Sequence, residues 1–472
     1  MNPFKNHPSE LRRLFFVELW ERFSYFGLSA ILILFMTSSL AEGGLGWEKD
    51  KALMVNGAYG AAIYLLAIPF SMVADRLLGA TTAVLMGAIL IMIGHVTLAL
   101  PLAITLFLGL ALVAIGTGFL KPSISGLVGD LYAGNRAADK NAGMTIFYMS
   151  ISVGGLLGPL VLGYIHDAKL GSPGAAWHLA FAAAAIGMGF ALVLFIPFWK
   201  SKTPVKKSDS VNLGLIGLVF LGSAGLLGLL VWGTSMPHVI WGLYALIPCA
   251  ALYFGFQKGK QRQAIWMVML LISTLVSAVI GQMISGLTLV IKDNVALSVF
   301  GWSFPVEYFA GFFSGFIILF SLINGNLKEG KASFINYTNA FTFGTAGFAL
   351  ALAIIGLAFM VSGGAKISAW VIIISYALKA ASEVLIVPTA LALMHDVSSE
   401  KNKSVTMAIW FLGAGLGVNM AKMLGISMDK VPMGLGQFFL LEAAGIALFA
   451  ATLWYLSKWL VAQVEEIKAA KV

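Results

Sequence analysis

The stretch VELWERFSYFG, residues 17–27, places three ionisable side chains inside an apolar run that extends over 14–40. Glu21 and Arg22 lie three and four residues beyond Glu18, so a helix brings all three onto neighbouring parts of one face. Charges within a bilayer cost about 2.5–3.5 kcal/mol each on insertion scales, which makes them candidates for function. Two carboxylates that share cations titrate as a coupled set. The spacing therefore predicts that proton binding by Glu18 or Glu21 releases a cation to bind an anionic solute.

Two further ionisable residues lie at comparable depths in other apolar runs. Lys121, in GTGFLKPSISG, is about 10 Å from the inner end of its span, a depth at which it can pair with Glu18 or Glu21. Glu383 is about 16 Å from the inner end of its own span. A structural ion cluster that pins helices together is the alternative interpretation. Lys379 lies one helical turn before Glu383 and is placed to neutralise it.

The composition indicates helices in a bilayer. Of the 472 residues, 59% are hydrophobic and 11% are charged, whereas soluble globular proteins carry roughly a quarter charged residues. In lipid every backbone polar group must be satisfied internally, which favours helical spans. We find no spacing typical of metal ligands or of a nucleophile–base pair, so we expect no metal, no cofactor and no enzymatic activity.

Fourteen apolar runs approach the length of about 20 residues that a span needs. They are 14–40, 52–73, 80–100, 102–126, 142–165, 176–198, 212–232, 237–256, 264–290, 304–324, 337–361, 367–394, 403–428 and 434–461. An even number places both termini on one side of the membrane. Most lysines and arginines fall in the loops on that side, which identifies it as the cytoplasm. The net charge of +9 is thus a topology signal and predicts no nucleic-acid partner.

Two basic polar stretches, at 200–210 and 257–263, divide the chain. They bracket one pair of spans and leave six spans before it and six after it. We expect an N-terminal six-helix bundle over 1–199, a cytoplasmic linker with two extra spans over 200–263, and a C-terminal six-helix bundle over 264–472. Two equal halves with a solute site between them at mid-membrane are typical of secondary transporters.

The chain resembles the proton-dependent oligopeptide transporter family of the major facilitator superfamily. The motifs that carry the resemblance are Glu18-x-x-Glu21-Arg22-Phe23-x-Tyr25-Phe26-Gly27, Gly116-x-Gly118-x-x-Lys121-Pro122, Phe147-Tyr148, FGWSFP at 300–305, Glu383 with Pro388, and Trp410-Phe411-Leu412. The extra pair of spans is similar to the insertion in bacterial members. The resemblance implies an all-α major facilitator fold in a bacterial inner membrane. It also implies a monomer that imports di- and tripeptides with protons by alternating access.

The resemblance implies a role for each matching residue. Those implied in proton coupling are Glu18, Glu21, Arg22 and Lys121. Those implied in substrate binding are Arg22, Tyr25, Tyr59, Lys121, Tyr148, Ser152, Gln282, Glu383 and Trp410, with Tyr64 as the alternative to Tyr59. In this scheme the cations face the peptide carboxylate and Glu383 receives its amino group. Apart from the resemblance, the position of Asp75 and Arg76 between the second and third spans predicts that they cap helices and gate the cytoplasmic side. Pro122 and Pro388 are expected to have gating or structural roles.

Several positions depart from the family pattern. Ser29 stands in place of a second arginine, Phe26 in place of a tyrosine, Ser152 and Phe313 in place of asparagines, and Ile280 and Gly281 where a glutamate is expected. A site that lacks such hydrogen-bond partners grips a peptide less well. From the resemblance as a whole we nevertheless expect di- or tripeptide import. The alternative is import of another small amphoteric or anionic solute, such as an amino acid derivative or a peptidomimetic.

Overall fold

A computed structural model of the chain describes most of its residues. They are residues 4, 7–101, 103–132, 137–168, 174–200, 260–329, 337–397 and 403–469, together with isolated positions between 201 and 259. The chain divides into two compact units, Met1–Leu229 and Leu230–Val472, and each is described by itself. The two extra spans expected over 212–232 and 237–256 lie almost entirely outside the described residues.

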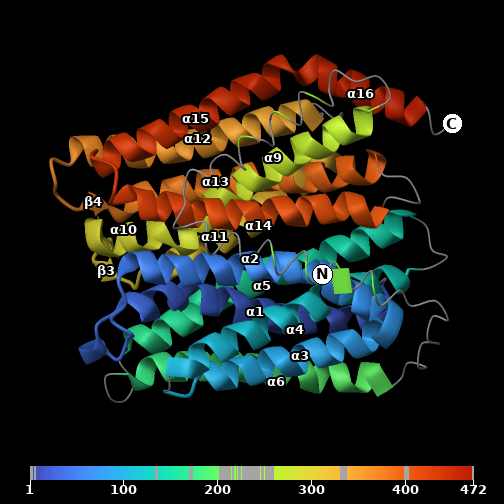
Figure 1. Cartoon of the computed structure of the whole chain (residues 1–472), viewed down its shortest axis with the longest axis horizontal. Coiled ribbons are helices and arrows are strands. Elements are labelled where there is room, and N and C mark those ends of the chain that lie inside the picture. The colour runs from blue at the N-terminus through green and yellow to red at the C-terminus, as the bar shows by residue number, and fades with distance from the viewer. Residues whose placement is uncertain are drawn as a thin grey trace. The chain divides into compact units, whose positions relative to one another are not determined.

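The described part of the first unit is helical. Its elements are α1 (Ser9–Thr37), η1 (Leu40–Glu42), α2 (Lys49–Val73), η2 (Ala74–Leu78), α3 (Ala80–Leu98), α4 (Ala103–Asp130), α5 (Ala137–Asp167) and α6 (Ala175–Lys200). Helix α1 packs against α5 and α6, α3 packs against α4 and α6, and α2 packs against α4 (Figure 1). These helices coincide with the first six predicted spans to within a few residues at most ends.

Helix α1 is enclosed by its neighbours along most of its length. The remaining candidate spans of this unit leave a larger share of their surface exposed, as helices that face lipid do. This enclosure explains how α1 carries Glu18, Glu21 and Arg22 within an apolar sequence: all three are buried inside protein instead of facing hydrocarbon.

Glycines on α5 allow α1 to approach at backbone distance. A Cβ atom at Gly154 would lie 2.5 Å from the carbonyl oxygen of Leu19, and one at Gly158 would lie 2.4 Å from that of Phe23. Real side chains do not tolerate such contacts, so small residues are required here. The added Cβ at Gly154 would also lie 2.7 Å from Cβ of Arg22, and this glycine therefore helps to set the position of Arg22.

The substitution Gly158→Ala is expected to lower the thermal unfolding temperature of the purified protein in detergent. Overpacking typically costs about 1–3 kcal/mol, and the atoms that the new methyl group would meet belong to the backbone of α1. Gly189→Ala on α6 is the matched control, because a Cβ there meets nothing within 4 Å. Equal unfolding temperatures for the two variants would contradict the direct contact between α1 and α5.

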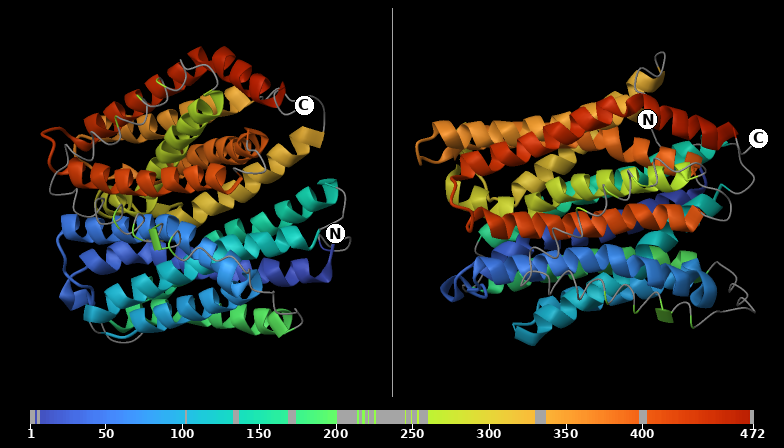
Figure 2. Two further views of the ribbon diagram at one scale, coloured as in Figure 1. Left: turned by 45° about the vertical axis from the view of Figure 1, so that its right-hand side comes forward. Right: turned by 45° about the horizontal axis from the view of Figure 1, so that its top comes forward.

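The described part of the second unit contains helices and four very short strands. Its elements are α9 (Gln261–Gly281), η4 (Gln282–Ile284), α10 (Gly286–Asn294), β1 (Val295–Ala296), β2 (Ser298–Val299), β3 (Trp302–Ser303), α11 (Tyr308–Glu329), α12 (Tyr337–Val361), β4 (Ile367–Ser368), α13 (Ala369–Val397), α14 (Lys403–Met428), α15 (Leu435–Tyr455) and α16 (Ser457–Ala469). Helix α12 packs against α13 and α15, and α14 packs against α9. Strand β1 pairs in parallel with β4, and β2 pairs antiparallel with β3. Helix α16 continues from α15 at an angle to it (Figure 2).

Eleven of the described helices are long and apolar enough to cross a membrane, and α11 adds a shorter apolar helix over Tyr308–Ile323. This tally treats α9 and α10 as one candidate over Gln261–Asn294. The all-α architecture predicted from composition is confirmed for the described part of the chain, apart from the short strand pairs.

The apolar run 264–290, predicted as one span, is interrupted in the structure. Helix α9 ends at Gly281 and α10 begins at Gly286. Side chains satisfy backbone carbonyls near the break, since Ser285 Oγ donates to the carbonyl of Gly281 at 2.7 Å and Thr288 Oγ1 donates to that of Met283 at 2.7 Å. Such satisfaction is what allows a broken helix at membrane depth.

The spacing of Gly413 and Gly417 predicts close helix packing, and the structure confirms it between α14 and α9. A Cβ at Gly413 would lie 2.7 Å from Cβ of Ser273, and one at Gly417 would lie 2.3 Å from the carbonyl oxygen of Thr274. Small residues at this interface let the two backbones approach. The same contact positions the N-terminal half of α14, where Trp410 lies.

Candidate functional site

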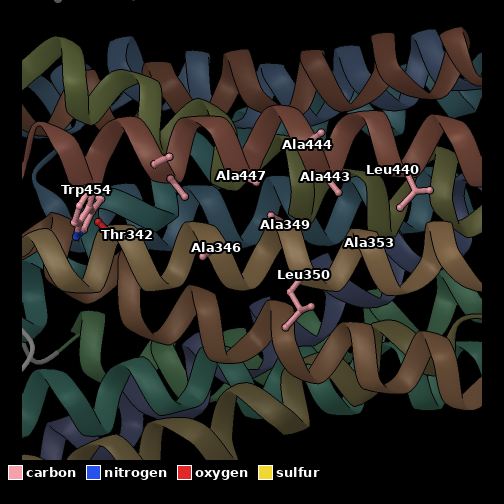
Figure 3. Close-up of a pocket in the computed structure, with 12 residues that line it drawn as sticks. Thr342, Ala346, Ala349, Leu350, Ala353, Leu440, Ala443, Ala444, Ala447 and Trp454 are labelled. Carbon is pink, nitrogen blue, oxygen red and sulfur yellow. The ribbon is translucent and has the colours of Figure 1, made fainter.

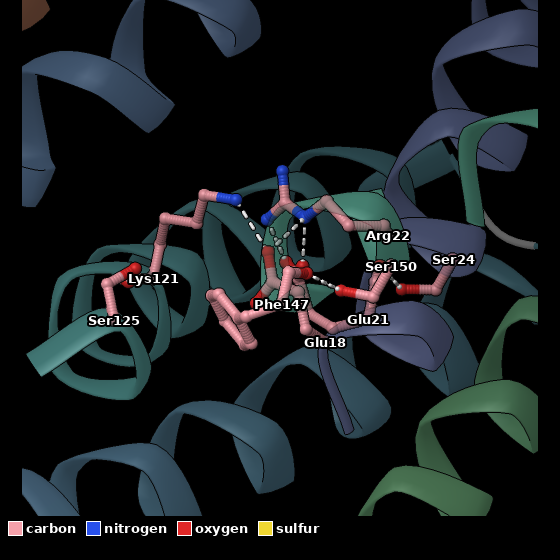
Figure 4. A network of polar contacts seen from close by, with 8 residues as sticks. All are labelled: Glu18, Glu21, Arg22, Ser24, Lys121, Ser125, Phe147 and Ser150. Carbon is pink, nitrogen blue, oxygen red and sulfur yellow. Dashed lines mark hydrogen bonds and ion pairs between the residues drawn. The ribbon is translucent and has the colours of Figure 1, made fainter. Parts of the chain in front are cut away.

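Four ionisable side chains meet in the first unit (Figure 4). Arg22 donates to both carboxylate oxygens of Glu21, through Nε to Oε2 and through Nη2 to Oε1 at 2.5 Å. Lys121 Nζ donates to Glu18 Oε1 at 2.6 Å, and Arg22 Nε lies 3.4 Å from the same oxygen. Two carboxylates therefore balance two cations. The ion pair between Lys121 and Glu18 is one of the two pairings that the predicted depth of Lys121 in its span allows.

The two pairs differ in accessibility. Glu18 and Glu21 are fully buried, the Arg22 side chain is 7% exposed, and the Lys121 side chain is 28% exposed. Both oxygens of Glu21 are engaged, whereas Glu18 Oε2 is buried without a hydrogen-bond partner among the described residues. A two-pronged arginine–carboxylate contact is strong and directional. Neutralising Glu21 thus frees a complete guanidinium fork, and neutralising Glu18 frees the more accessible amine.

Glycines on α4 position Lys121. A Cβ at Gly116 would lie 2.7 Å from the carbonyl oxygen of Gly87 on α3, and one at Gly118 would lie 3.0 Å from the ring of Phe70 on α2. These small residues let α4 pack closely on α3 and α2. The two glycines of the fourth-span motif therefore have a packing reason that is separate from the charge of Lys121.

Tyr25 packs directly against the charged cluster. Its side chain is buried, and the Arg22 guanidinium lies 4.9 Å from the centre of its ring, an arrangement that favours a cation. Ser29 and Tyr64 are within hydrogen-bonding reach of its hydroxyl group. Ser29, which replaces the expected second arginine, is therefore a neutral neighbour of Tyr25 inside the bundle. The ring of Phe26 stacks edge-on against Tyr25 at 5.0 Å.

The other predicted polar residues of this unit lie at different depths. Tyr59 is buried, and its hydroxyl has no hydrogen-bond partner among the described residues. It is close enough to Glu21 to interact with its charge. Tyr148 on α5 is 46% exposed and feels the charge of Glu18. Ser152 is half-buried on the same helix. The structure thus brings Tyr25, Tyr59 and Tyr148 towards the cluster.

In the second unit, Glu383 and Trp410 lie on α13 and α14. Glu383 is partly buried, and its Oε2 has no hydrogen-bond partner in the described part of the chain. Trp410 is 8% exposed, and its backbone carbonyl accepts a hydrogen bond of 2.7 Å from Ser273 Oγ on α9. Glu383 thus keeps acceptor capacity, as a residue that receives an amino group must.

The structure shows no hydrogen bond between Lys379 and Glu383, the carboxylate that Lys379 was expected to neutralise. Lys379 is completely buried, and its Nζ has no hydrogen-bond partner among the described side chains or backbone groups. Its Nζ lies 5.3 Å from the centre of the Tyr376 ring, one turn back on the same helix. Gln282, predicted to bind substrate, donates its amide N–H to Glu442 and is engaged inside the protein.

Glu442 is the residue that our sequence reasoning missed. Its signal was available, because it is a single acid in the apolar run FFLLEAAGIALF and intramembrane acids are functional candidates by default. It escaped notice because no motif surrounds it and because no spacing links it to the charges on other spans.

The departures from the family pattern have local packing counterparts. Phe313, in place of an asparagine, is buried and its ring lies 6.3 Å from that of Tyr376. A Cβ at Gly281 would lie 3.0 Å from Cβ of Ala421, so a glutamate there would press into α14. Ile280 is half-buried beside it. The structure therefore accommodates these apolar and small residues in its core.

The predicted gating and structural residues are only partly described. Asp75 and Arg76 lie in η2, a short π-helical segment, but their side chains are outside the described ones, and their gating role stays a prediction. Pro122 lies inside α4 and Pro388 inside α13. Each proline removes one backbone N–H from its helix.

An apolar groove of about 670 Å³ runs between α12 and α15. Figure 3 shows the residues that line it: Thr342, Ala346, Ala349, Leu350, Ala353, Leu440, Ala443, Ala444, Ala447, Ala450, Ala451 and Trp454. None of the residues predicted to bind substrate belongs to this set. The groove is therefore separate from the predicted substrate-binding residues.

Comparisons with known proteins agree with these features. A model of the POT family matches residues 81–440. The chain is 30% identical to a di-/tripeptide transporter of Lactococcus lactis over 87% of each chain, and 28% identical to the peptide transporter YePEPT of Yersinia enterocolitica over 91% of this chain and 90% of that one.

A solved structure shows the same fold. The crystal structure of a POT family transporter in complex with 5-aminolevulinic acid superposes with a TM-score of 0.83 at 27% identity, and the match covers 97% of this chain and 98% of that one. The predicted major facilitator fold in a membrane is thereby confirmed. With a family match across most of its length, this chain belongs to the POT family of membrane transporters.

Proposed function

We propose that this protein imports di- and tripeptides together with protons by alternating access, in a bacterial inner membrane with both termini in the cytoplasm. The buried, charge-balanced cluster of Glu18, Glu21, Arg22 and Lys121 carries the proposal. A proton on Glu21 weakens the two close hydrogen bonds that Arg22 donates to it and leaves Arg22 the longer contact with Glu18, which Glu18 already shares with Lys121. A buried charge that is incompletely balanced is costly. The carboxylate of an entering peptide supplies the missing charge, so proton and peptide bind together.

The remaining roles follow from the chemistry of a zwitterionic peptide. Arg22 and Lys121 bind its carboxylate. Glu383, whose Oε2 has no hydrogen-bond partner among the described residues, binds its amino group. The hydroxyl of Tyr59, also without a hydrogen-bond partner among the described residues, bonds to the peptide backbone. Trp410 contacts the peptide side chain. The named functions of the Lactococcus and Yersinia relatives support a peptide as the solute.

The direct test is uptake of radiolabelled dialanine by proteoliposomes under an imposed inward proton gradient. We expect dialanine to rise inside above its outside concentration and a protonophore to collapse that difference. Protein-free liposomes are the control. Uptake that stops when the two concentrations are equal would overturn proton coupling, and the absence of protein-dependent uptake would overturn peptide import.

A small amino acid derivative is the second candidate solute. The specific observations are that Ser29 and Phe313 replace residues suited to holding a peptide, and that a POT family structure similar to this chain contains 5-aminolevulinic acid. Ligands stabilise the state that they bind. We expect dialanine to raise the unfolding temperature of the purified protein more than 5-aminolevulinic acid does at equal concentration. The reverse order would favour the second candidate.

A further inference from the structure

The motif FGWSFP at 300–305 has no part in the transport scheme above, and it forms a hairpin with an apolar, exposed tip. Strands β2 and β3 pair antiparallel, and Phe300 and Gly301 form the turn between them. The side chain of Phe300 is 93% exposed, and that of Trp302 beside it is exposed as well. The hairpin therefore presents two aromatic rings to its surroundings.

The backbone at the tip disfavours phenylalanine. Phe300 has a φ of 50° and Gly301 a φ of 81°, and a two-residue turn with two positive φ angles typically takes Asn-Gly or a similar pair. Phe300 is the only residue other than glycine with a positive φ in the described part of the chain. The turn after α12, at the same end of the unit, has glycines at its positive φ angles, Gly363 and Gly364. A bulky residue in this conformation indicates that the ring itself has a use.

The root of the hairpin is fixed to the rest of the unit. The backbone N–H of Phe304 donates to the carbonyl of Leu297 at 3.1 Å. Phe304 is buried, and its ring packs edge-on at 5.5 Å against that of Phe309 on α11. Strand β1, which leads into the hairpin, pairs with β4, which leads into α13. The tip is therefore held in a defined place, at the end of the unit away from α16 (Figure 1).

The tip adjoins the side of α13 that faces away from the buried charge on this helix. The ring of Phe300 lies 5.5 Å from that of Trp370 in the first turn of α13. Trp370 and Ile374, one turn apart, are both exposed on a helix that is a candidate membrane span. Lys379 follows Trp370 by about two and a half turns, which places it on the opposite face, and it is completely buried. Ionisable residues within spans face the interior of the bundle, so the exposed face of α13 beside Phe300 is the one that meets lipid.

We propose that the hairpin tip, Phe300 with Trp302, inserts into the interfacial layer of the lipid bilayer and anchors this end of the second unit there. The turn residues are exposed, and exposed irregular backbone is excluded from the hydrocarbon interior. Aromatic rings are enriched in the layer between hydrocarbon and water, and the indole of Trp302 suits it because one end is apolar and the other polar. The ring of Phe300 extends the lipid-facing surface of α13 into this layer. The inference does not depend on which solute the protein carries.

The test uses a spin label at Ser298→Cys, an exposed position two residues before the tip, in protein reconstituted into phosphatidylcholine vesicles. The single cysteine of the chain is first removed by Cys249→Ser. Collisions of the label with oxygen, which concentrates in lipid, and with a water-soluble nickel chelate report its surroundings. Labels at Leu350, exposed in the middle of α12, and at Lys366, exposed after its end, calibrate lipid and water. We expect the label at Ser298 to be less accessible to the chelate and more accessible to oxygen than the label at Lys366.

Variants at the tip separate the ring from the turn. Phe300→Asn keeps a residue that tolerates a positive φ but removes the ring, so chelate accessibility at Ser298 should rise towards the value at Lys366. Phe300→Trp retains an aromatic ring and should keep the native value, a rescue that a role in shaping the turn does not predict. With the native tip, chelate accessibility equal to that at Lys366 would overturn the inference whether or not a variant folds. Low accessibility to both reagents, as beneath a protein partner or a second copy of the chain, would overturn it too, as would a value that Phe300→Asn leaves unchanged.

Discussion

Glu21→Gln is expected to abolish gradient-driven accumulation of dialanine by proteoliposomes while sparing counterflow exchange. Glutamine resembles a protonated glutamate in size and charge, but it cannot release a proton. It also turns an N–H donor towards Arg22, which is itself only a donor, so the two-pronged contact seen at Glu21 is lost. Arg22 then stays available to the solute at any proton concentration. The proton gradient therefore no longer drives accumulation of the solute.

The measurement compares two assays on the same vesicles. Under an imposed proton gradient, dialanine inside Glu21→Gln vesicles should rise only to its outside concentration. In counterflow, with unlabelled dialanine inside and labelled dialanine outside, exchange should continue near the native rate. Glu48→Gln removes an exposed carboxylate of the same unit and should behave as the native protein does. Undiminished accumulation by Glu21→Gln would refute the coupling role of Glu21.

Lys121→Met is expected to destabilise the protein more than Glu21→Gln does. It should also abolish both accumulation and counterflow of dialanine. The amine of Lys121 lies 2.6 Å from Glu18 Oε1, and removing one member of a buried ion pair costs about 3–5 kcal/mol. Because the lysine side chain is 28% exposed, we expect a loss at the lower end of that range. Transport should fail in both assays because the solute carboxylate loses one of its two cations.

Thermal unfolding in detergent separates the two consequences of Lys121→Met. Adding Glu18→Gln removes the charge left unpaired, so the double variant should regain most of the lost unfolding temperature without regaining counterflow. Lys366→Met, which removes an exposed cation, is the control for loss of charge. A single variant as stable as this control, or a double variant that transports dialanine, would show that the pair does not have the role proposed here.

Much of the N-terminal site was predictable because burying charge restricts the possible arrangements severely. Three charges on one helix face had to point into protein, and the rise per residue placed Lys121 at their depth. The structure has Glu18, Glu21 and Arg22 buried, with Lys121 on Glu18. The spans themselves were visible as long apolar runs, since a bilayer demands uninterrupted hydrophobic length.

The C-terminal unit shows where such reasoning ends. Spacing along α13 favoured Glu383 as the partner of Lys379, whereas in the structure Lys379 Nζ has no hydrogen-bond partner among the described residues. Glu442 on α15, an acid that no motif marked, instead accepts a hydrogen bond from Gln282. Apolar runs reveal the length of a helix but not its neighbours or its rotation. For the same reason the interruption near Gln282 was not foreseen, and that interruption places its amide on Glu442.

The central claim is that binding of the solute and uptake of a proton by Glu21 are one event. Calorimetric titration of the purified protein with dialanine, repeated in buffers of different ionisation enthalpy, counts the protons taken up on binding. We predict uptake of about one proton per bound dialanine near neutral pH, and none by Glu21→Gln although it still binds dialanine. Equal proton uptake by the two proteins, or binding to the native protein without any uptake, would contradict the claim.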